Sequence, residues 1–315
     1  MKNINNTEQD LSVLRVELEL INKCNLNCPL CARNINMSID DKKNPSMLSL
    51  ENIQSLPKLF PNLKFVTIAG PTSEPTLHPD LIKIVSKLFE FGYTIELFIN
   101  GSLPLKNGKP DTNLTKKLAL LFKENSGRLL YTICGSTQEL HQKYRKGSNL
   151  DEVMANVDEA MKYNPNTILT WIIFEYNQED YNQNHHKYSK YNLESFYTLP
   201  VKEFYNTNSK INLDKYTGIN LIPELSKIYN TLDINKMIPK ESFNLLCKSK
   251  RNGFRLIDSK GDIYLCSLNK YFGFKKCHEC HPDNLNILRN AKINTLAESE
   301  DESSELIFQL QEGMK

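Results

Sequence analysis

The sequence lacks the features that mark several large classes of protein. Its formal net charge is only +2 over 315 residues, so no strong electrostatic field favours nucleic acid or an anionic membrane surface as a partner. No uncharged apolar run approaches the roughly 18 residues of a membrane span. Residues 1–10 are polar, whereas a secretory signal has an apolar centre, and there are no internal repeats. We therefore expect a cytoplasmic protein that binds neither nucleic acid nor membranes.

Apolar stretches typical of strands alternate with stretches of helical spacing. Hydrophobic residues make up 40% of the chain, which is enough for a sizeable core at this length. Strands are predicted at 11–20, 64–69, 94–99, 128–133, 167–174 and 196–204, and helices beginning at 49 and covering 80–91, 114–123, 150–161 and 180–191. Residues 40–46 are predicted to be a polar loop. This alternation is typical of parallel βαβ units, whose reactive residues lie at the carboxyl ends of the strands.

Three cysteines follow the first predicted strand at the spacing C-x3-C-x2-C, namely Cys24, Cys28 and Cys31. Three thiolates close together can hold a [4Fe–4S] cube, yet they ligate only three of its irons and leave the fourth open to a small chelating ligand. A zinc site would need a fourth ligand nearby, and the next residues offer none. The three cysteines of this motif cannot all pair with one another, and a reducing compartment disfavours disulfides.

This motif after an apolar strand resembles the signature of the radical S-adenosylmethionine (SAM) superfamily. In that family SAM chelates the open iron, and an electron from the cluster splits it to give a 5′-deoxyadenosyl radical that removes a hydrogen atom from a C–H bond. The resemblance implies an α/β fold, a partial (β/α)6 TIM-like barrel, with a SAM-binding [4Fe–4S] cluster and SAM as cofactors. It also implies an external electron donor such as flavodoxin or ferredoxin.

Further segments resemble the family's SAM-binding loops at the ends of later strands. Residues 70–80 resemble a Gly-Gly-Glu-Pro segment, although Pro71, Thr72 and Ser73 separate Gly70 from Glu74. An ordinary strand-to-helix turn is the alternative for this segment, and an Asn-Gly turn is the alternative at 100–101. The resemblance implies SAM-binding roles for Gly70, Ser73, Glu74, Asn100, Thr132 and Arg145. The arginine could pair with a carboxylate in bidentate fashion.

Cys134 stands where the family usually has aspartate. A thiol at the end of a strand could return a hydrogen atom to a substrate radical, as radical epimerases require. The simpler interpretation is a small buried apolar residue, the usual place of a free cysteine.

A second cysteine set lies in the last third of the chain, and its members are Cys247, Cys266, Cys277 and Cys280. The set surrounds a predicted hairpin of 254–257 and 262–265. It resembles the twitch domain, the short form of the SPASM auxiliary domain, which implies a second, fully ligated [4Fe–4S] cluster. A structural zinc site with four cysteine ligands is the alternative. We therefore divide the chain into a core at 1–205, a linker or insertion at 206–240, an auxiliary domain at 241–292 and a tail at 293–315.

We expect an oxidoreductase or epimerase-type enzyme that oxidises, epimerises or crosslinks its substrate. Relatives that act on peptides often carry an N-terminal peptide-binding domain, and only 23 residues precede Cys24. This favours a small metabolite such as a sugar or aminocyclitol over a ribosomally made peptide. A metal-stabilised binding protein without turnover is the third alternative, since Leu30 stands where the family usually has an aromatic residue.

Overall fold

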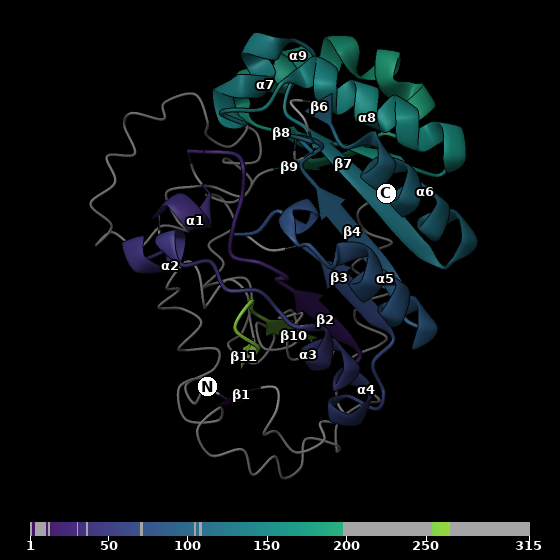
Figure 1. Cartoon of the computed structure of the whole chain (residues 1–315). Coiled ribbons are helices and arrows are strands. Elements are labelled where there is room, and N and C mark those ends of the chain that lie inside the picture. Colours follow the sequence, from purple (N-terminus) through teal and green to yellow (C-terminus); the bar gives the residue numbers. More distant parts are fainter. Residues whose placement is uncertain are drawn as a thin grey trace, which may run out of the picture.

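The computed structural model describes residues 2–3, 11, 13–29, 31–35, 37–69, 72–103, 105–106, 109–197 and 254–264. Nine strands form one sheet in the order β1-β11-β10-β2-β3-β4-β7-β8-β9 (Figure 1). Their bounds are β1 Lys2–Asn3, β2 Arg15–Leu18, β3 Phe65–Ile68, β4 Thr94–Ile99, β7 Gly127–Ile133, β8 Ile168–Ile173, β9 Glu194–Tyr197, β10 Phe254–Ile257 and β11 Asp262–Tyr264. A separate hairpin joins β5 (Leu105–Lys106) to β6 (Lys109–Pro110).

The centre of the sheet is parallel. Strands β2, β3, β4, β7, β8 and β9 pair in this order, each parallel to the next. The predicted α/β class with parallel βαβ units is therefore confirmed. Strand β10 adds to the other side of β2, also in parallel, and β11 pairs back on β10 as the predicted hairpin.

Helices follow the strands with few departures from the sequence pattern. Their bounds are α1 Ala32–Ile35, α2 Ile39–Lys43, α3 Leu50–Gln54, α4 Leu56–Leu59, α5 Leu81–Glu90, α6 Thr112–Glu124, α7 Gln138–Tyr144, α8 Leu150–Tyr163 and α9 Gln178–Asn184, with 3₁₀ helices η2 Pro75–Leu77, η3 Glu175–Asn177 and η4 His185–Tyr191. Local caps explain several starts. Ser49 forms a capping box at α3, and Asn149 accepts two backbone N–H bonds at α8.

The hydrophobic core lies between one face of the sheet and the helices α5, α6 and α8, which run along it (Figure 1). Alternate strand residues point into this layer because successive side chains of a strand face opposite sides. In β4, for example, Ile95, Leu97 and Ile99 are at most 2% exposed, while the residues between them are half-buried. On α5, Leu81, Ile84, Val85 and Leu88 repeat at helical spacing and are buried.

The structure departs from the predicted elements in several places, among them the start of the strand predicted at 196–204, since β9 begins at Glu194. The predicted loop at 40–46 contains most of helix α2. Ser38 caps this helix, and the acidic first turn and basic last turn of α2 suit the helix dipole. The predicted helix at 180–191 is α9 followed by η4, and it ends at Asn192 in the left-handed region (φ 50). Helix α7, capped by Thr137, was not predicted. Among the described helices, none combines the length and apolar character needed to span a bilayer.

Candidate active site

The parallel strands bring the candidate site residues to one edge of the sheet. The cysteine loop follows β2, the segment holding Glu74 follows β3, Asn100 follows β4, and Cys134 follows β7. Because parallel strands end at the same edge, these segments are neighbours in space although up to about a hundred residues separate them in sequence. Backbone contacts link them: Glu74 donates its N–H to the Lys23 carbonyl at 2.9 Å.

The cysteine loop is held at both ends by short polar contacts. After its start, the Leu26 N–H points to Cys24 Sγ at 3.4 Å, and the Asn100 amide reaches the same sulfur at 3.8 Å. Near its end, the Cys31 N–H donates to the Cys28 carbonyl at 3.2 Å, and Asn34 donates to the same carbonyl at 2.8 Å. All three cysteines are half-buried thiols, and none of them is in a disulfide within the described residues. The two contacts with Cys24 place N–H groups on its sulfur, and such bonds stabilise a thiolate.

The pKa values of the three thiols are all raised. Burial, followed by the nearby Glu74 carboxylate, raises the pKa of Cys24 to about 11. Burial raises the pKa of Cys28 to about 12 against the opposing effect of Arg145, and burial also raises that of Cys31. Neighbouring cysteines also raise the pKa values of Cys24 and Cys28, so the sulfurs influence one another. Iron would have to displace these protons on binding.

Glu74 joins the β3 segment to the end of β4. It is 2% exposed, and its carboxylate accepts the Asn100 N–H at 2.9 Å, the Thr76 N–H at 3.2 Å and the Thr76 hydroxyl at 2.7 Å. Burial raises its pKa, while these three donors lower it. The Asn100 side chain in turn donates to Asn25 at 2.8 Å, and the next residue, Gly101, turns the chain at a φ of +77°. The junction therefore connects three of the four segments.

Arg145, at the end of α7, lies between the cysteine loop and Cys134. It hydrogen-bonds Cys134, and its charge acts on both Cys28 and Cys134. Burial alone would lower the pKa of Arg145, but Cys134 and Cys28 raise it by more. The net pKa is therefore above its ordinary value, and the guanidinium stays charged. Cys134 itself is 0% exposed, which suits the simple buried interpretation as well as a contact across the site.

A buried polar chain runs behind these residues. The Cys134 N–H donates to His141 Nδ1 at 3.3 Å, and His141 Nε2 lies 2.9 Å from the Ser148 hydroxyl. Ser148 continues to the Ser102 hydroxyl at 2.8 Å. Because Nδ1 accepts a backbone N–H, the proton of the neutral ring belongs on Nε2. Burial, with a smaller effect of Arg145, lowers the pKa of His141 to about 3.

The donor set of this edge fits a cluster better than a single ion. Within the described segments, no three His, Cys, Asp or Glu side chains are arranged to hold one metal ion. A cube presents its irons over a larger body, so its thiolate ligands stand farther apart than the ligands of one ion. Five buried side-chain polar atoms have no hydrogen-bond partner in the described part of the chain, and Ser73 Oγ and Arg145 Nε are two of them. Such atoms are what a bound polar ligand would satisfy.

The structure brings some of the predicted site residues together and leaves others apart. Cys24, Glu74 and Asn100 form one connected group, and Arg145 links Cys28 to Cys134. Thr132 lies on β7 two residues before Cys134; its hydroxyl accepts a bond from Thr170 at 2.9 Å, and no hydrogen bond joins it to the connected group within the described residues. Seven residues named above lie outside the described residues: Leu30, Gly70, Pro71, Cys247, Cys266, Cys277 and Cys280.

Three further site residues were not predicted from the sequence. Asn25 connects the cysteine loop to Asn100. Asn177 is 0% exposed and bonds the Cys134 carbonyl at 2.8 Å. Glu19, 1% exposed at the end of β2, accepts the Thr72 hydroxyl. Glu19 continues the alternation of charged and apolar residues along β2, so neither its burial nor that of Asn177 had a signal in the sequence.

Comparisons with known proteins agree with this geometry. A model of the Radical SAM superfamily matches residues 18–186. The 7,8-dihydro-6-hydroxymethylpterin dimethyltransferase of Methanocaldococcus jannaschii is 29% identical over 153 residues, which cover 48% of this chain and 28% of that relative. The chain therefore matches under a third of this relative's length.

Two solved structures share the fold at low sequence identity. Streptococcus suis SuiB bound to precursor peptide SuiA has a TM-score of 0.58 and 13% identity, over 92% of this chain and 66% of SuiB. The structure of anSMEcpe with bound AdoMet has a TM-score of 0.51 and 17% identity, over 81% of this chain and 74% of its own. Since the family model covers more than half of the chain, including Cys24, Cys28 and Cys31, this protein belongs to the Radical SAM superfamily.

Proposed function

We propose that this chain binds a [4Fe–4S] cluster on Cys24, Cys28 and Cys31 and cleaves SAM reductively to begin radical chemistry on a substrate. The observation that carries the proposal is the meeting of the cysteine loop with Glu74, Asn100 and the two unpartnered polar atoms at one sheet edge. When bound, the cluster and SAM supply the means of removing a substrate hydrogen atom. The chain's own residues hold and orient both.

Each residue at the edge has a distinct part in this proposal. The three thiolates bind iron once their protons are displaced. Arg145, whose Nε is free of partners in the described part of the chain, suits the carboxylate of SAM. Ser73 and Asn100 suit its other polar groups, and Glu74 fixes the position of Asn100 by accepting its backbone N–H. Gly70 and Thr132 complete the proposed SAM-binding set.

The substrate that we propose is a small metabolite, oxidised or epimerised by the enzyme. The name of the Methanocaldococcus relative gives a pterin, a small molecule, as what that protein acts on. A peptide substrate is the second candidate, because SuiB was solved with a precursor peptide and anSMEcpe with the Cp18Cys peptide. Mass analysis of products from pools of either kind would distinguish the two. Methyl transfer would appear as a gain of carbon and would contradict both oxidation and epimerisation.

We also propose that Cys247, Cys266, Cys277 and Cys280 hold an auxiliary [4Fe–4S] cluster that accepts or relays an electron. Four thiolates ligate such a cluster fully, which suits electron transfer. An external donor such as flavodoxin or ferredoxin would supply the first electron. Protein reconstituted without oxygen should then contain about eight irons. A content of about four irons with one zinc would remove the auxiliary cluster and leave the first site intact.

The central test is the formation of 5′-deoxyadenosine from SAM and dithionite. The wild-type protein should form it, and a Cys28→Ala variant should lose both the product and the iron of the first site, because two thiolates cannot hold the cube. Cys134→Ala is the matched control, since this cysteine is not among the proposed ligands. If the reconstituted wild-type protein forms no 5′-deoxyadenosine, the chain is a binding protein and the proposal is wrong.

A further inference from the structure

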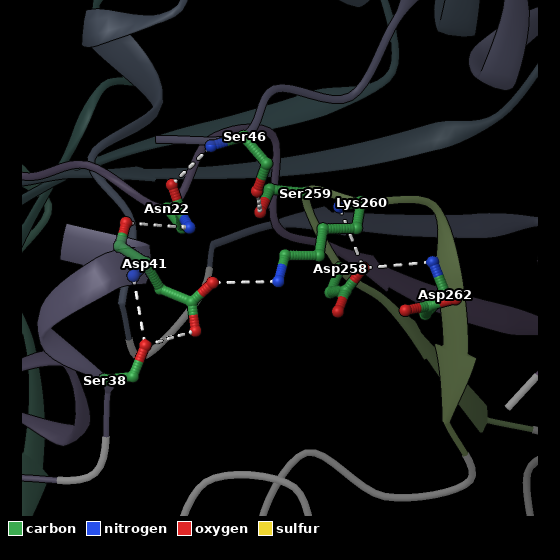
Figure 2. A network of polar contacts seen from close by, with 8 residues as sticks. All are labelled: Asn22, Ser38, Asp41, Ser46, Asp258, Ser259, Lys260 and Asp262. Carbon is green, nitrogen blue, oxygen red and sulfur yellow. Dashed lines mark hydrogen bonds and ion pairs between the residues drawn. The ribbon is translucent and has the colours of Figure 1, made fainter. Parts of the chain in front are cut away.

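The turn of the β10–β11 hairpin contacts the segment that follows the cysteine loop (Figure 2). Lys260 Nζ forms an ion pair with Asp41 of α2 at 2.8 Å. The hydroxyls of Ser259 and Ser46 lie 2.6 Å apart. We call residues 258–261 the hairpin turn. It lies outside the residues matched by the family model, so that match assigns it no role.

The residues contacted by the hairpin turn hold the start of the cysteine loop. Asn22 donates its N–H to the Ser46 carbonyl at 3.2 Å, and its side chain accepts the Ser46 N–H at 2.8 Å. The Asn22 amide also reaches the Asp41 carbonyl at 3.5 Å (Figure 2). Asn22 is 5% exposed and precedes Cys24 by two residues. Movement of Ser46 or Asp41 would therefore be transmitted to the first cysteine.

The same segment reaches the far end of the cysteine loop. Lys42, next to Asp41 in α2, donates to the Asn34 carbonyl at 3.3 Å. Asn34 donates its side-chain amide to the Cys28 carbonyl at 2.8 Å and its N–H to the Cys31 carbonyl at 2.8 Å. Helix α2 thus connects the hairpin turn to the second and third cysteines.

The hairpin turn is closed by its own hydrogen bonds and is bonded to the sheet. Asp258 is 3% exposed, and its side chain accepts the N–H groups of Lys260 and Asp262, both at 2.9 Å (Figure 2). Gly261 closes the turn at a φ of +78° and donates to the Asp258 carbonyl at 2.9 Å. On the sheet side, the Glu19 N–H donates to the Ile257 carbonyl at 2.9 Å. A turn with this support can hold a neighbouring loop without first being ordered itself.

We propose that the hairpin turn is a positioning element for the cysteine loop, acting through Ser259 and Lys260 on Ser46 and Asp41. It keeps both ends of the loop in place, so a segment more than two hundred positions away along the chain sets how firmly the three thiols are held. The contacts concern the loop itself and do not depend on which ligand it binds.

The test uses the full chain without metal and measures how fast each cysteine reacts with iodoacetamide under oxygen-free conditions. A Ser259→Ala/Lys260→Ala variant should raise the rates at Cys24, Cys28 and Cys31 about tenfold, the change that about 1.4 kcal/mol of loop opening produces. Cys134 is the internal reference, because it is 0% exposed and follows β7 rather than the loop. Its rate should stay unchanged.

Two further variants make the test specific. The single variant Lys260→Arg keeps a cation at the ion pair and leaves Ser259 intact, so its loop thiols should react at wild-type rates. Lys162→Ala removes a comparable exposed pair with Glu159, at 2.6 Å within α8, and should change no cysteine. After reconstitution, the double variant should also lose iron to a chelator about tenfold faster than the wild type.

Two outcomes would overturn the proposal. If the loop thiols keep wild-type rates in the double variant, the hairpin turn does not hold them. If Cys134 accelerates together with the loop thiols, the substitutions weaken the whole fold rather than the loop. Neither outcome depends on 5′-deoxyadenosine formation, so this result and that of the functional test are separate.

Discussion

The Glu74 junction allows a quantitative prediction about stability. Glu74→Ala would leave three buried donors without their acceptor: the Asn100 N–H, the Thr76 N–H and the Thr76 hydroxyl. Each unsatisfied buried group costs about 1–3 kcal/mol. Water entering the space left by the side chain would recover part of this, so we expect a loss of about 3–5 kcal/mol in the free energy of unfolding.

Urea unfolding of the metal-free protein, followed by circular dichroism, measures this loss. The midpoint should fall while the slope m stays constant, since the surface exposed on unfolding is little changed. Glu74→Gln is the matched variant: it keeps one acceptor oxygen but turns an amide N–H towards another donor, so its loss should be about half as large. A loss below about 1 kcal/mol for Glu74→Ala would refute the view that the carboxylate connects these segments.

Three other predictions follow from the site. Arg145→Lys should weaken SAM binding about tenfold in equilibrium titration without changing the iron content, because lysine cannot form the bidentate contact; equal affinity would exclude the carboxylate role. Because the pKa of His141 is about 3 when folded and 6.5 in its ordinary state, the unfolded chain binds an extra proton between these values. The free energy of unfolding should therefore be highest above pH 6.5 and fall towards pH 3, by up to about 5 kcal/mol. His141→Gln should make the free energy of unfolding depend less on pH in urea titrations. An unchanged pH dependence would contradict the lowered pKa of His141. Asn177→Ala should cost about 2–4 kcal/mol in urea unfolding, since it leaves the Phe174 N–H without this acceptor and removes a donor from the Ile172 carbonyl and from the Cys134 carbonyl, which keeps the Tyr176 hydroxyl. A neutral result would contradict the role of these bonds.

Features set by neighbouring residues were predictable from the sequence. The alternation of 94–99 predicted β4 with the same bounds, and the helical spacing from 150 predicted the start of α8. Gly92 stands after α5 at a φ of +80°, as a glycine at the end of a helix should. The spacing of the three cysteines is by itself enough to indicate the family. Each of these signals lies within about ten residues of what it predicts, so no long-range contact is needed to read it.

Contacts between distant segments could not be predicted in the same way. The side chain of Glu74 looks from the sequence like part of a loop motif, and only the fold shows that it accepts the Asn100 N–H. The hairpin at 254–264 was predicted, but its pairing with β2 was not, because strand character does not reveal which edge a strand will join. The ion pair of Lys260 with Asp41 spans 219 positions and depends on that pairing.

The placement of β10 beside β2 has a consequence for biosynthesis. Roughly 240 residues separate the two strands, so at 5–20 residues per second a ribosome needs about 10–50 seconds between making one and the other. During that interval the flank of β2 that β10 will cover shows unpaired N–H and C=O groups, which invite strands from other nascent chains. Overexpression should therefore favour aggregation before synthesis is finished, and slower growth at low temperature with chaperones should raise the soluble yield.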